Sequence, residues 1–346
     1  MMVSVLIVHK NDPFLWFTIN ALLRDTDHSK FEIIIVDDGS DDPLKINTTL
    51  YPNVRVIHNI PSQGVGHSFD RGVEVAQGDI IILTASDVIV KDSTWLQQAI
   101  DYATNYRGSL GCSVCLSLDP RHLDPNFPAD DVKRYGATTL PFFTTDDLRS
   151  DSPLLDTTFY EVGLFENKWI KKKPVEDITE VPAIYGAFYV TIKAWYNTIH
   201  GWDTVRNMKL SGHSCYGGLE PWISIKSWLG GGRCHILKTL ETGHVFHKFE
   251  RENTDRLNQN TRDDLYWYNK FFIAYTMLPK AEADKLINKV YDLRIQFDLF
   301  TMQFNVARKL IQGNWDYVMS VKNRNEREFT HSFDWYCEKF DILKRY

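Results

Sequence analysis

Four short runs of β-branched and other apolar residues most constrain the fold of this chain. They occupy residues 3–8, 32–36, 54–58 and 79–84. Helical apolar spacing follows three of them, at residues 14–24, 67–77 and 93–104. Strands that alternate with helices at such intervals predict an α/β fold built on a parallel sheet with right-handed crossovers. Such sheets bind ligands at the carboxyl ends of their strands, so the polar residues there are the first candidates for a site.

The second part of the chain has a different character. Residues 118–160 are rich in Pro, Asp and Thr and lack periodicity, which indicates an irregular surface segment. Beyond it we expect a strand and a helix at 186–196, a helix at 216–229 and a strand at 234–240. Helical patterns then dominate, at residues 262–278, 281–300 and 301–321. We therefore expect an α/β domain over residues 1–260 and a C-terminal helical region over residues 261–346.

Composition narrows the class of protein without naming a ligand. The 346 residues are 43% hydrophobic and 24% charged, which is typical of a globular protein. The net charge of −6 gives no general indication of a nucleic-acid partner. We expect no membrane association, because the N-terminus lacks a signal-peptide pattern and no apolar run reaches about 18 residues. Five sparse cysteines suit reduced thiols and predict a cytoplasmic location.

Carboxylates follow the second and fourth expected strands. The second strand runs into EIIIVDDGSDD, whose paired carboxylates include Asp38, which can accept the imide proton of a uracil base. The fourth reads GDIIILTASD, where Asp87 can bind a divalent cation that neutralises a diphosphate, with Ser86 as a neighbouring donor. The alternative is that these carboxylates serve only their own turns, as acceptors for nearby backbone groups.

Two glycine-containing motifs lie further along the chain. In YGGLEPWISIKSW, Glu220 can act as a general base toward an acceptor hydroxyl, and Trp222 can pack on a sugar. In ETGHVFHKFER, His244 can complete a metal site with Asp87, a donor set that suits Mn²⁺. His247 adds positive charge there and is a candidate for acceptor binding. The alternatives are a dipole-stabilising glutamate, a core tryptophan and a core histidine.

The order of these segments resembles that of GT-A glycosyltransferases of the family 2 type, whose fold is a Rossmann-like nucleotide-sugar-binding domain. The later segments resemble more specifically the polypeptide N-acetylgalactosaminyltransferases. In that group GGLF, a Gly-Tyr/Phe-Asp element, WGGENLE and GHVFRK follow one another. The corresponding stretches here are GAF at 186–188, GWD at 201–203, YGGLEPWISIKSWLGGG at 216–232, GHVFHK at 243–248 and NTR at 260–262.

For the donor, the resemblance implies contacts from three parts of the chain. Asp38, or its neighbour Asp37, matches the carboxylate that binds uracil. Arg71 stands where the group has an arginine before a glycine. Tyr216 takes the place of the motif tryptophan over the donor. The resemblance therefore predicts a nucleoside diphosphate sugar, most simply a UDP-sugar, as the bound donor.

For metal and catalysis, this sequence departs from the group. Asp87 and His244 match two metal-binding positions, but Ala85 replaces the first carboxylate of the Asp-x-Asp motif. A divalent cation, Mn²⁺ or Mg²⁺, is still expected, with the diphosphate as a further ligand. The Glu-Asn pair of the group becomes Leu219-Glu220, so Glu220 fits instead the glutamate of the broader family 2 enzymes. Retaining and inverting stereochemistry both stay open.

The sequence thus predicts a glycosyltransferase, transferring a hexose or pentose from a UDP-sugar to a hydroxyl of a glycan or protein. The membrane anchor and lectin domain of the resembling eukaryotic enzymes are not recognised, so no Golgi role is expected. One alternative is a phage-type enzyme that glycosylates 5-hydroxymethylated pyrimidines in DNA inside an infected host. Its aromatic and basic candidates lie in the tail: Trp315, Trp335, Tyr336, Arg308, Lys309, Lys322, Arg324, Arg327, Lys339, Lys344 and Arg345. The other, motivated by Ala85, is a non-catalytic nucleotide-sugar-binding protein.

Overall fold

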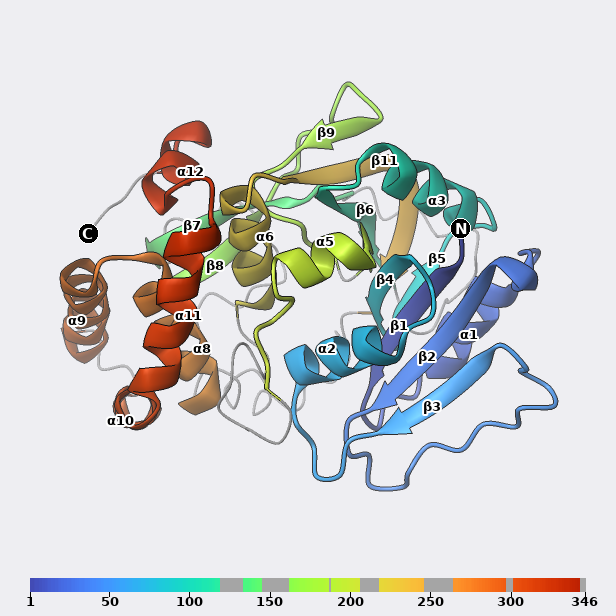
Figure 1. The fold of residues 1–346 in the computed structure, drawn as a ribbon, viewed down its shortest axis with the longest axis horizontal. Helices are drawn as coiled ribbons and strands as arrows, with labels where there is room; N and C mark the ends of the chain where they lie inside the picture. The colour runs from blue at the N-terminus through green and yellow to red at the C-terminus, as the bar shows by residue number, and fades with distance from the viewer. Residues whose placement is uncertain are drawn as a thin grey trace.

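A large mixed sheet and a group of C-terminal helices form the protein. The computed structural model describes residues 1–118, 133–144, 162–186, 188–205, 218–245, 264–296 and 301–342. In Figure 1 the sheet and its covering helices lie to the right, and the C-terminal helices gather at the left. Mixed α/β architecture with a helical C-terminal part was predicted, and it is confirmed.

The N-terminal part of the sheet is parallel, as predicted. Its strands lie in the order β3-β2-β1-β4. They are β1 (Val3–His9), β2 (Phe31–Asp37), β3 (Val54–His58) and β4 (Ile80–Ala85). The connecting helices are α1 (Leu15–Leu23), the short 3-10 turn η1 (His28–Lys30) and α2 (Val65–Val75). Because β1 and β2 are buried throughout most of their length, they read as continuous apolar runs.

Beyond β4 the sheet is mixed, which corrects the prediction of a parallel sheet. The order continues β4-β10-β6-β11-β5, and β9 pairs with β11. β10 runs antiparallel to β4 and β6, and β5 runs antiparallel to β11. Antiparallel neighbours need no helical crossover, so strand-helix alternation does not reveal them. The strands are β5 (Val88–Val90), β6 (Ser109–Ser117), β9 (Ile178–Glu180), β10 (Phe188–Ile192) and β11 (Arg233–His244).

A separate hairpin interrupts the segment that was predicted to be irregular. β7 (Ala137–Thr144) pairs antiparallel with β8 (Val162–Trp169) in a two-stranded sheet. The prediction of an irregular segment at residues 118–160 was therefore wrong for β7. Threonines and one proline interrupt its apolar residues, so the sequence shows no strand pattern there. Three further helices cover the sheet: α3 (Trp95–Asn105), α5 (Lys193–Thr198) and α6 (Leu219–Leu229).

Five helices complete the described chain. They are α8 (Asp264–Met277), α9 (Lys280–Gln296), α10 (Met302–Gly313), α11 (Trp315–Glu328) and α12 (Phe333–Lys339). One hydrophobic cluster runs from Leu6 in the sheet through Trp222 in α6 to Phe271 in α8 and Val318 in α11. Among the described helices, none combines the length and apolar character that crossing a bilayer requires.

Candidate active site

The carboxyl ends of β1, β2 and β3 meet at one edge of the sheet. The parallel register places His9, Asp37 and His58 side by side there. Asp37 accepts hydrogen bonds from the backbone N–H of Leu44 at 2.9 Å and from Nδ1 of His58 at 3.0 Å. Its Oδ1 also accepts hydrogen bonds from the backbone N–H and the hydroxyl of Ser40. Burial opposes its charge, yet these bonds lower the pKa of Asp37 below its ordinary value.

Asp38 organises the loop that leads into α2. Its Oδ1 accepts from Asn59 Nδ2 and the Gln63 N–H, each at 2.8 Å. Its Oδ2 accepts from Ser62 Oγ at 2.7 Å and the Gly64 N–H at 2.8 Å. Burial disfavours the charge, but these four donors together lower the pKa of Asp38. Asp38 therefore does accept hydrogen bonds from nearby groups, which was the alternative to ligand binding. Its contact with uracil stays a prediction.

Arg71 of α2 connects this loop to a cavity. Its guanidinium donates to the carbonyl of His58 and to the side-chain oxygen of Asn59. The cavity beside it has a volume of about 490 Å³ and is lined by His58, Asn59, Ile60, Gln63, His67, Asp70, Arg71, Glu74 and Thr204. Arg71 and Asp38 thus share Asn59 as a partner, and Arg71 brings a fixed positive charge to the cavity wall.

Asp87 and His244 lie together, as the sequence predicted. The short strand β5 begins one residue after Asp87, and its antiparallel pairing with β11 sets Val88 opposite His244. Nε2 of His244 is 3.1 Å from Oδ2 of Asp87, and both side chains are largely buried. Burial alone would lower the pKa of His244, but the facing carboxylate outweighs it and raises the pKa to about 10. Ser86 precedes this pair, and its carbonyl accepts from Thr18 Oγ1 at 2.8 Å.

This pair fits part of a divalent-cation site. Neighbouring ligands of an octahedral cation bound at about 2.1 Å lie about 3 Å apart, which is the spacing of Asp87 Oδ2 and His244 Nε2. A carboxylate oxygen and an imidazole nitrogen are suitable ligands for Mn²⁺. Among the described residues, no cluster of three or more His, Cys, Asp or Glu side chains is arranged to hold a metal. Within the part of the chain that the structure describes, Asp87 and His244 could thus offer two ligands, and a cation would take others from elsewhere, such as the donor or water.

Glu220 lies in the first turn of α6, which Gly218 opens in a left-handed conformation with φ +73°. Tyr189 of β10 donates its hydroxyl to Oε1 of Glu220 at 3.0 Å. Phe188 of β10 pairs with Thr84 of β4. Tyr189 therefore lies beside the end of β4 that leads to Asp87. Burial raises the pKa of Glu220. A half-buried carboxylate with a raised pKa is suited to take a proton from a hydroxyl.

Three other predicted residues have different outcomes. Trp222 is 0% exposed and packs edge-on against Phe272, with ring centroids 5.2 Å apart. The proposal that it contacts an acceptor is therefore wrong, because every residue of α6 from Pro221 onward is buried. Tyr216 and His247 lie outside the described residues.

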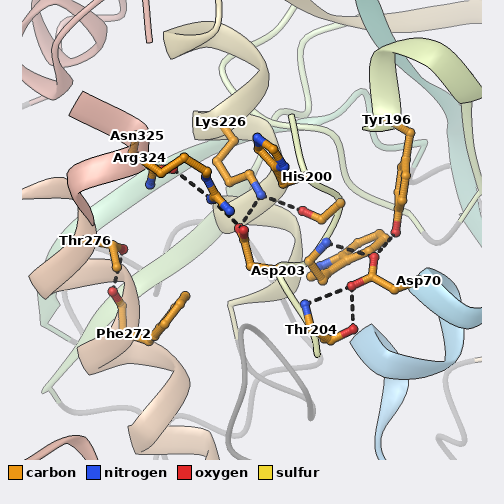
Figure 2. A network of polar contacts seen from close by, with 12 residues as sticks. Asp70, Tyr196, His200, Asp203, Thr204, Lys226, Phe272, Thr276, Arg324 and Asn325 are labelled. Carbon is orange, nitrogen blue, oxygen red and sulfur yellow. Dashed lines mark hydrogen bonds and ion pairs between the residues drawn. The ribbon is translucent and has the colours of Figure 1, made fainter. Parts of the chain in front are cut away.

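The short segment 200–205 contacts both the sheet domain and the C-terminal helices (Figure 2). Asp203 contacts Lys226 of α6 and Arg324 of α11, each at 2.5 Å. Asp70 of α2 accepts the N–H groups of Trp202 and Thr204, both at 3.0 Å. Burial raises the pKa of Asp70 in spite of these bonds. Because Thr204 lines the cavity beside Arg71, this network sets one wall of that cavity.

Several residues at the site were not found from the sequence. Tyr189 lies inside an apolar strand, and Glu166 lies in β8, which was not predicted. Lys270 is 0% exposed in the apolar stretch YWYNKFFIAY. A lone charge inside an apolar helix is a usable signal, because a buried charge requires a partner.

Two of the tail cations proposed for DNA contact are engaged inside the protein. Arg324 pairs with Asp203, and Lys322 donates to the carbonyl of Leu278 at 2.8 Å. Tyr336 is 0% exposed, so the proposal that it stacks on an extruded base is wrong. Lys344 and Arg345 lie outside the described residues.

Comparison with protein families identifies the N-terminal part of the chain. Residues 4–129 match the family model described as glycosyl transferase family 2. This part of the chain is therefore similar to family 2 glycosyltransferases. The matched residues include Asp37, Asp38, Arg71 and Asp87, whereas Glu220 and His244 lie beyond them.

Relatives extend the likeness past the residues that match the family 2 model. The chain is 24% identical over 254 residues to human polypeptide N-acetylgalactosaminyltransferase 10, covering 71% of this chain and 38% of that protein. It is 27% identical over 268 residues to the human transferase 14, covering 75% of this chain and 44% of the relative. The chain thus spans about two fifths of the length of these relatives. Both relatives are named as glycosyltransferases, and the likeness to them extends well beyond residue 129.

A solved structure supports the fold. GalNAc-T7, crystallised with UDP, GalNAc and Mn²⁺, superposes with a TM-score of 0.53 at 17% identity, covering 71% of this chain and 43% of that one. The superposed part of the chain therefore shares the GT-A fold. The resemblance that the motifs indicated is confirmed.

Proposed function

We propose that this protein transfers a sugar from a nucleoside diphosphate sugar, most simply a UDP-sugar, to a hydroxyl group of a glycan or protein. The observation that carries the proposal is the Asp87–His244 pair at 3.1 Å, in which Asp87 follows β4 within the residues that match the family 2 model. GalNAc-T7, of the same fold, binds UDP and Mn²⁺, and the relatives are N-acetylgalactosaminyltransferases.

Two groups of residues at the sheet edge would bind different parts of the donor. We propose that Asp87 and His244, with Ser86 beside them, would hold a Mn²⁺ or Mg²⁺ ion against the diphosphate. When bound, the cation would supply positive charge for the departing diphosphate. Arg71 and the loop organised by Asp37 and Asp38 would bind the nucleoside. Tyr216 is proposed as a further donor contact and His247 as an acceptor contact, both from the matching motifs.

Glu220 is proposed as the residue that accepts the proton of the acceptor hydroxyl. Its Oε1 is fixed by Tyr189, so the remaining oxygen can face an acceptor. Transfer of that proton strengthens the hydroxyl as a nucleophile as it forms the new glycosidic bond and the diphosphate leaves. This assignment fits the inverting reaction of the broader family 2 enzymes; the sugar and acceptor are not chosen by these residues. The division into domains at residue 260 and a cytoplasmic location remain predictions.

A donor panel tests the proposal. Purified protein is mixed with UDP-GlcNAc, UDP-GalNAc, UDP-glucose and GDP-mannose, with Mn²⁺ or with EDTA, and thermal shift and nucleotide release are measured. We expect one UDP-sugar to stabilise the protein and to be turned over with Mn²⁺. Binding without turnover on glycan, peptide and 5-hydroxymethylated DNA acceptors would favour the non-catalytic binder. Turnover only on the DNA would select the phage-type alternative, for which neither the relatives nor the described tail offers support.

A further inference from the structure

Two carboxylates at the sheet edge already accept as many hydrogen bonds as their oxygens allow. Oδ1 of Asp37 accepts from the backbone N–H and the hydroxyl of Ser40. Its Oδ2 accepts from the N–H of Leu44 and from Nδ1 of His58. Each oxygen of Asp38 also accepts two bonds, from the four donors described above. A carboxylate has about four lone-pair sites, so a base bound beside this loop needs another acceptor.

Asp70, which lines the cavity beside Arg71, is engaged in the same way. Its two oxygens accept four bonds, from the hydroxyl of Tyr196, from both donors of Thr204 and from a backbone N–H. The side-chain oxygen of Asn59 accepts from the guanidinium of Arg71. The oxygens of Asp70 and Asn59 therefore serve the internal structure of the protein, as those of the two strand-end carboxylates do.

His58 presents a fixed acceptor to this cavity. It is the last residue of β3, and its side chain is 35% exposed and lines the cavity. Its Nδ1 is 3.0 Å from Oδ2 of the buried Asp37. Because an ionised carboxylate can only accept, Nδ1 carries the proton, and Nε2 of the neutral imidazole is then an acceptor. Within the part of the chain that the structure describes, Nε2 has no hydrogen-bond partner.

The surroundings of His58 suit a flat heterocycle. Ile60 lines the same cavity with an apolar side chain that is 81% exposed, so it can pack on the face of a base. Arg71 donates to the carbonyl of His58, which ties the end of β3 to α2. The volume of about 490 Å³ is in the range of cavities that bind small molecules. An apolar contact, a fixed acceptor and a fixed cation therefore meet in one cavity.

We propose that Nε2 of His58 recognises the base of the donor by accepting the N3–H of uracil. This inference rests on the proposed function for the class of the donor. Cytosine has an acceptor at N3, so it would face Nε2 without a hydrogen between the two nitrogens. His58 therefore selects uracil over cytosine, and Asp37 acts indirectly by holding the imidazole. The acceptor role that the sequence assigned to Asp38 passes to the neighbouring strand.

Nucleotide affinities test the proposal without turnover. UDP, CDP and N3-methyl-UDP are titrated into the protein with Mn²⁺ by isothermal calorimetry, in alkaline buffer, where imidazole is neutral. We expect the wild type to bind UDP about tenfold or more tightly than the other two, since each of them leaves Nε2 without its hydrogen bond. In His58→Asn the amide nitrogen takes the place of Nδ1 beside Asp37, but nothing replaces Nε2. The preference for UDP should then fall to within about threefold.

Two controls separate recognition by His58 from general effects. His28→Asn makes the same change outside the cavity, at a histidine whose Nε2 is 2.8 Å from the carbonyl of Leu23. Gln63→Ala removes the nearby side-chain amide, whose nitrogen donates to the carbonyl of Pro61 at 2.9 Å. Both variants should keep the preference for UDP, and melting temperatures check that each is folded. A preference lost in Gln63→Ala and kept in His58→Asn would place the acceptor at Gln63 and overturn the proposal.

The outcomes distinguish this inference from the proposed function. A wild-type protein that binds neither UDP nor any UDP-sugar rejects the proposed function, and the assignment of the base falls with it. If a UDP-sugar is bound and turned over, yet the wild type binds UDP, CDP and N3-methyl-UDP equally, only the role of His58 is wrong. This second result needs no variant. A preference that persists unchanged in folded His58→Asn has the same meaning.

Discussion

The ammonium of Lys226 lies 2.5 Å from Oδ2 of Asp203, and their side chains are 0% and 1% exposed. Arg324 approaches the other oxygen of the same carboxylate, also at 2.5 Å. One buried anion therefore joins α6, in the sheet domain, to α11, in the C-terminal helices (Figure 2). Burying a charge is costly unless it is paired, so each member of this trio depends on the others.

Removing that carboxylate should destabilise the whole protein. Asp203→Ala leaves the buried Lys226 and the partly buried Arg324 without their anion, and we expect the free energy of unfolding to fall by about 3–5 kcal/mol. Urea denaturation followed by circular dichroism measures the change. Lys280→Ala is the matched control, since its ion pair with Asp284 is 64% and 37% exposed and should contribute less than about 1 kcal/mol. Equal losses in the two variants would contradict the importance of burial at Asp203.

Removing one side chain of the Asp87–His244 pair should weaken the metal-dependent part of donor binding. In His244→Ala we expect the affinity for the selected UDP-sugar with Mn²⁺ to fall at least about tenfold, because a metal ligand is lost. Affinity in EDTA should be similar to that of the wild type. Isothermal titration calorimetry with and without Mn²⁺ gives both values. A variant that loses affinity equally in both buffers would show that His244 does not act through a cation.

Glu220→Gln should spare the donor and lower turnover. The amide cannot accept the acceptor proton, so we expect kcat to fall by about 10²–10⁴-fold with little change in donor affinity. In the wild type, burial raises the pKa of Glu220. Since only the ionised carboxylate acts as a base, activity should be lost as pH falls through that raised value. A pH profile of nucleotide release measures this, and a flat profile in the acid range would argue against Glu220.

A buried histidine far from these groups should make stability depend on pH. Burial lowers the pKa of His235 from 6.5 to about 4, and its Nδ1 is 3.0 Å from the Tyr102 hydroxyl. Between these two values the unfolded chain binds a proton at His235 and the folded chain does not. The free energy of unfolding should therefore fall by up to about 3 kcal/mol as pH drops from 6.5 to 4. His235→Gln should flatten this slope in urea titrations, and an unaltered slope would exclude His235 as its source.

The parts of the site that could be predicted are those governed by local pattern. The strands β1 to β4 are recognisable as apolar runs in the sequence. The positions of Asp37 and Asp87 at strand ends then follow from the parallel topology. The contact between Asp87 and His244 came from the motifs, and the structure explains it by the pairing of β5 with β11. That three-residue strand is too short for periodicity to detect.

The parts that could not be predicted depend on contacts between distant segments. β10 joins the sheet without a crossover helix, so its antiparallel direction leaves no trace in the alternation. Trp222 was expected at a ligand because its motif contains glycines, yet its side chain packs against Phe272, fifty residues later. Lys270 stands alone in an apolar helix, which signals a buried charge, but its partner Glu166 comes from β8, a strand that was not predicted. In each case the interacting residue or strand is distant in the sequence, so a local pattern cannot indicate it.

The continuous core that joins the sheet to the C-terminal helices also limits how such an enzyme can diversify. Helices attached by a flexible linker can be exchanged between proteins as a unit. Here α8 and α6 share the cluster that includes Trp222 and Phe271, so a foreign tail would have to match this interior shape. Divergence in substrate choice is therefore expected through surface loops and single substitutions along these helices, not through recombination of whole modules.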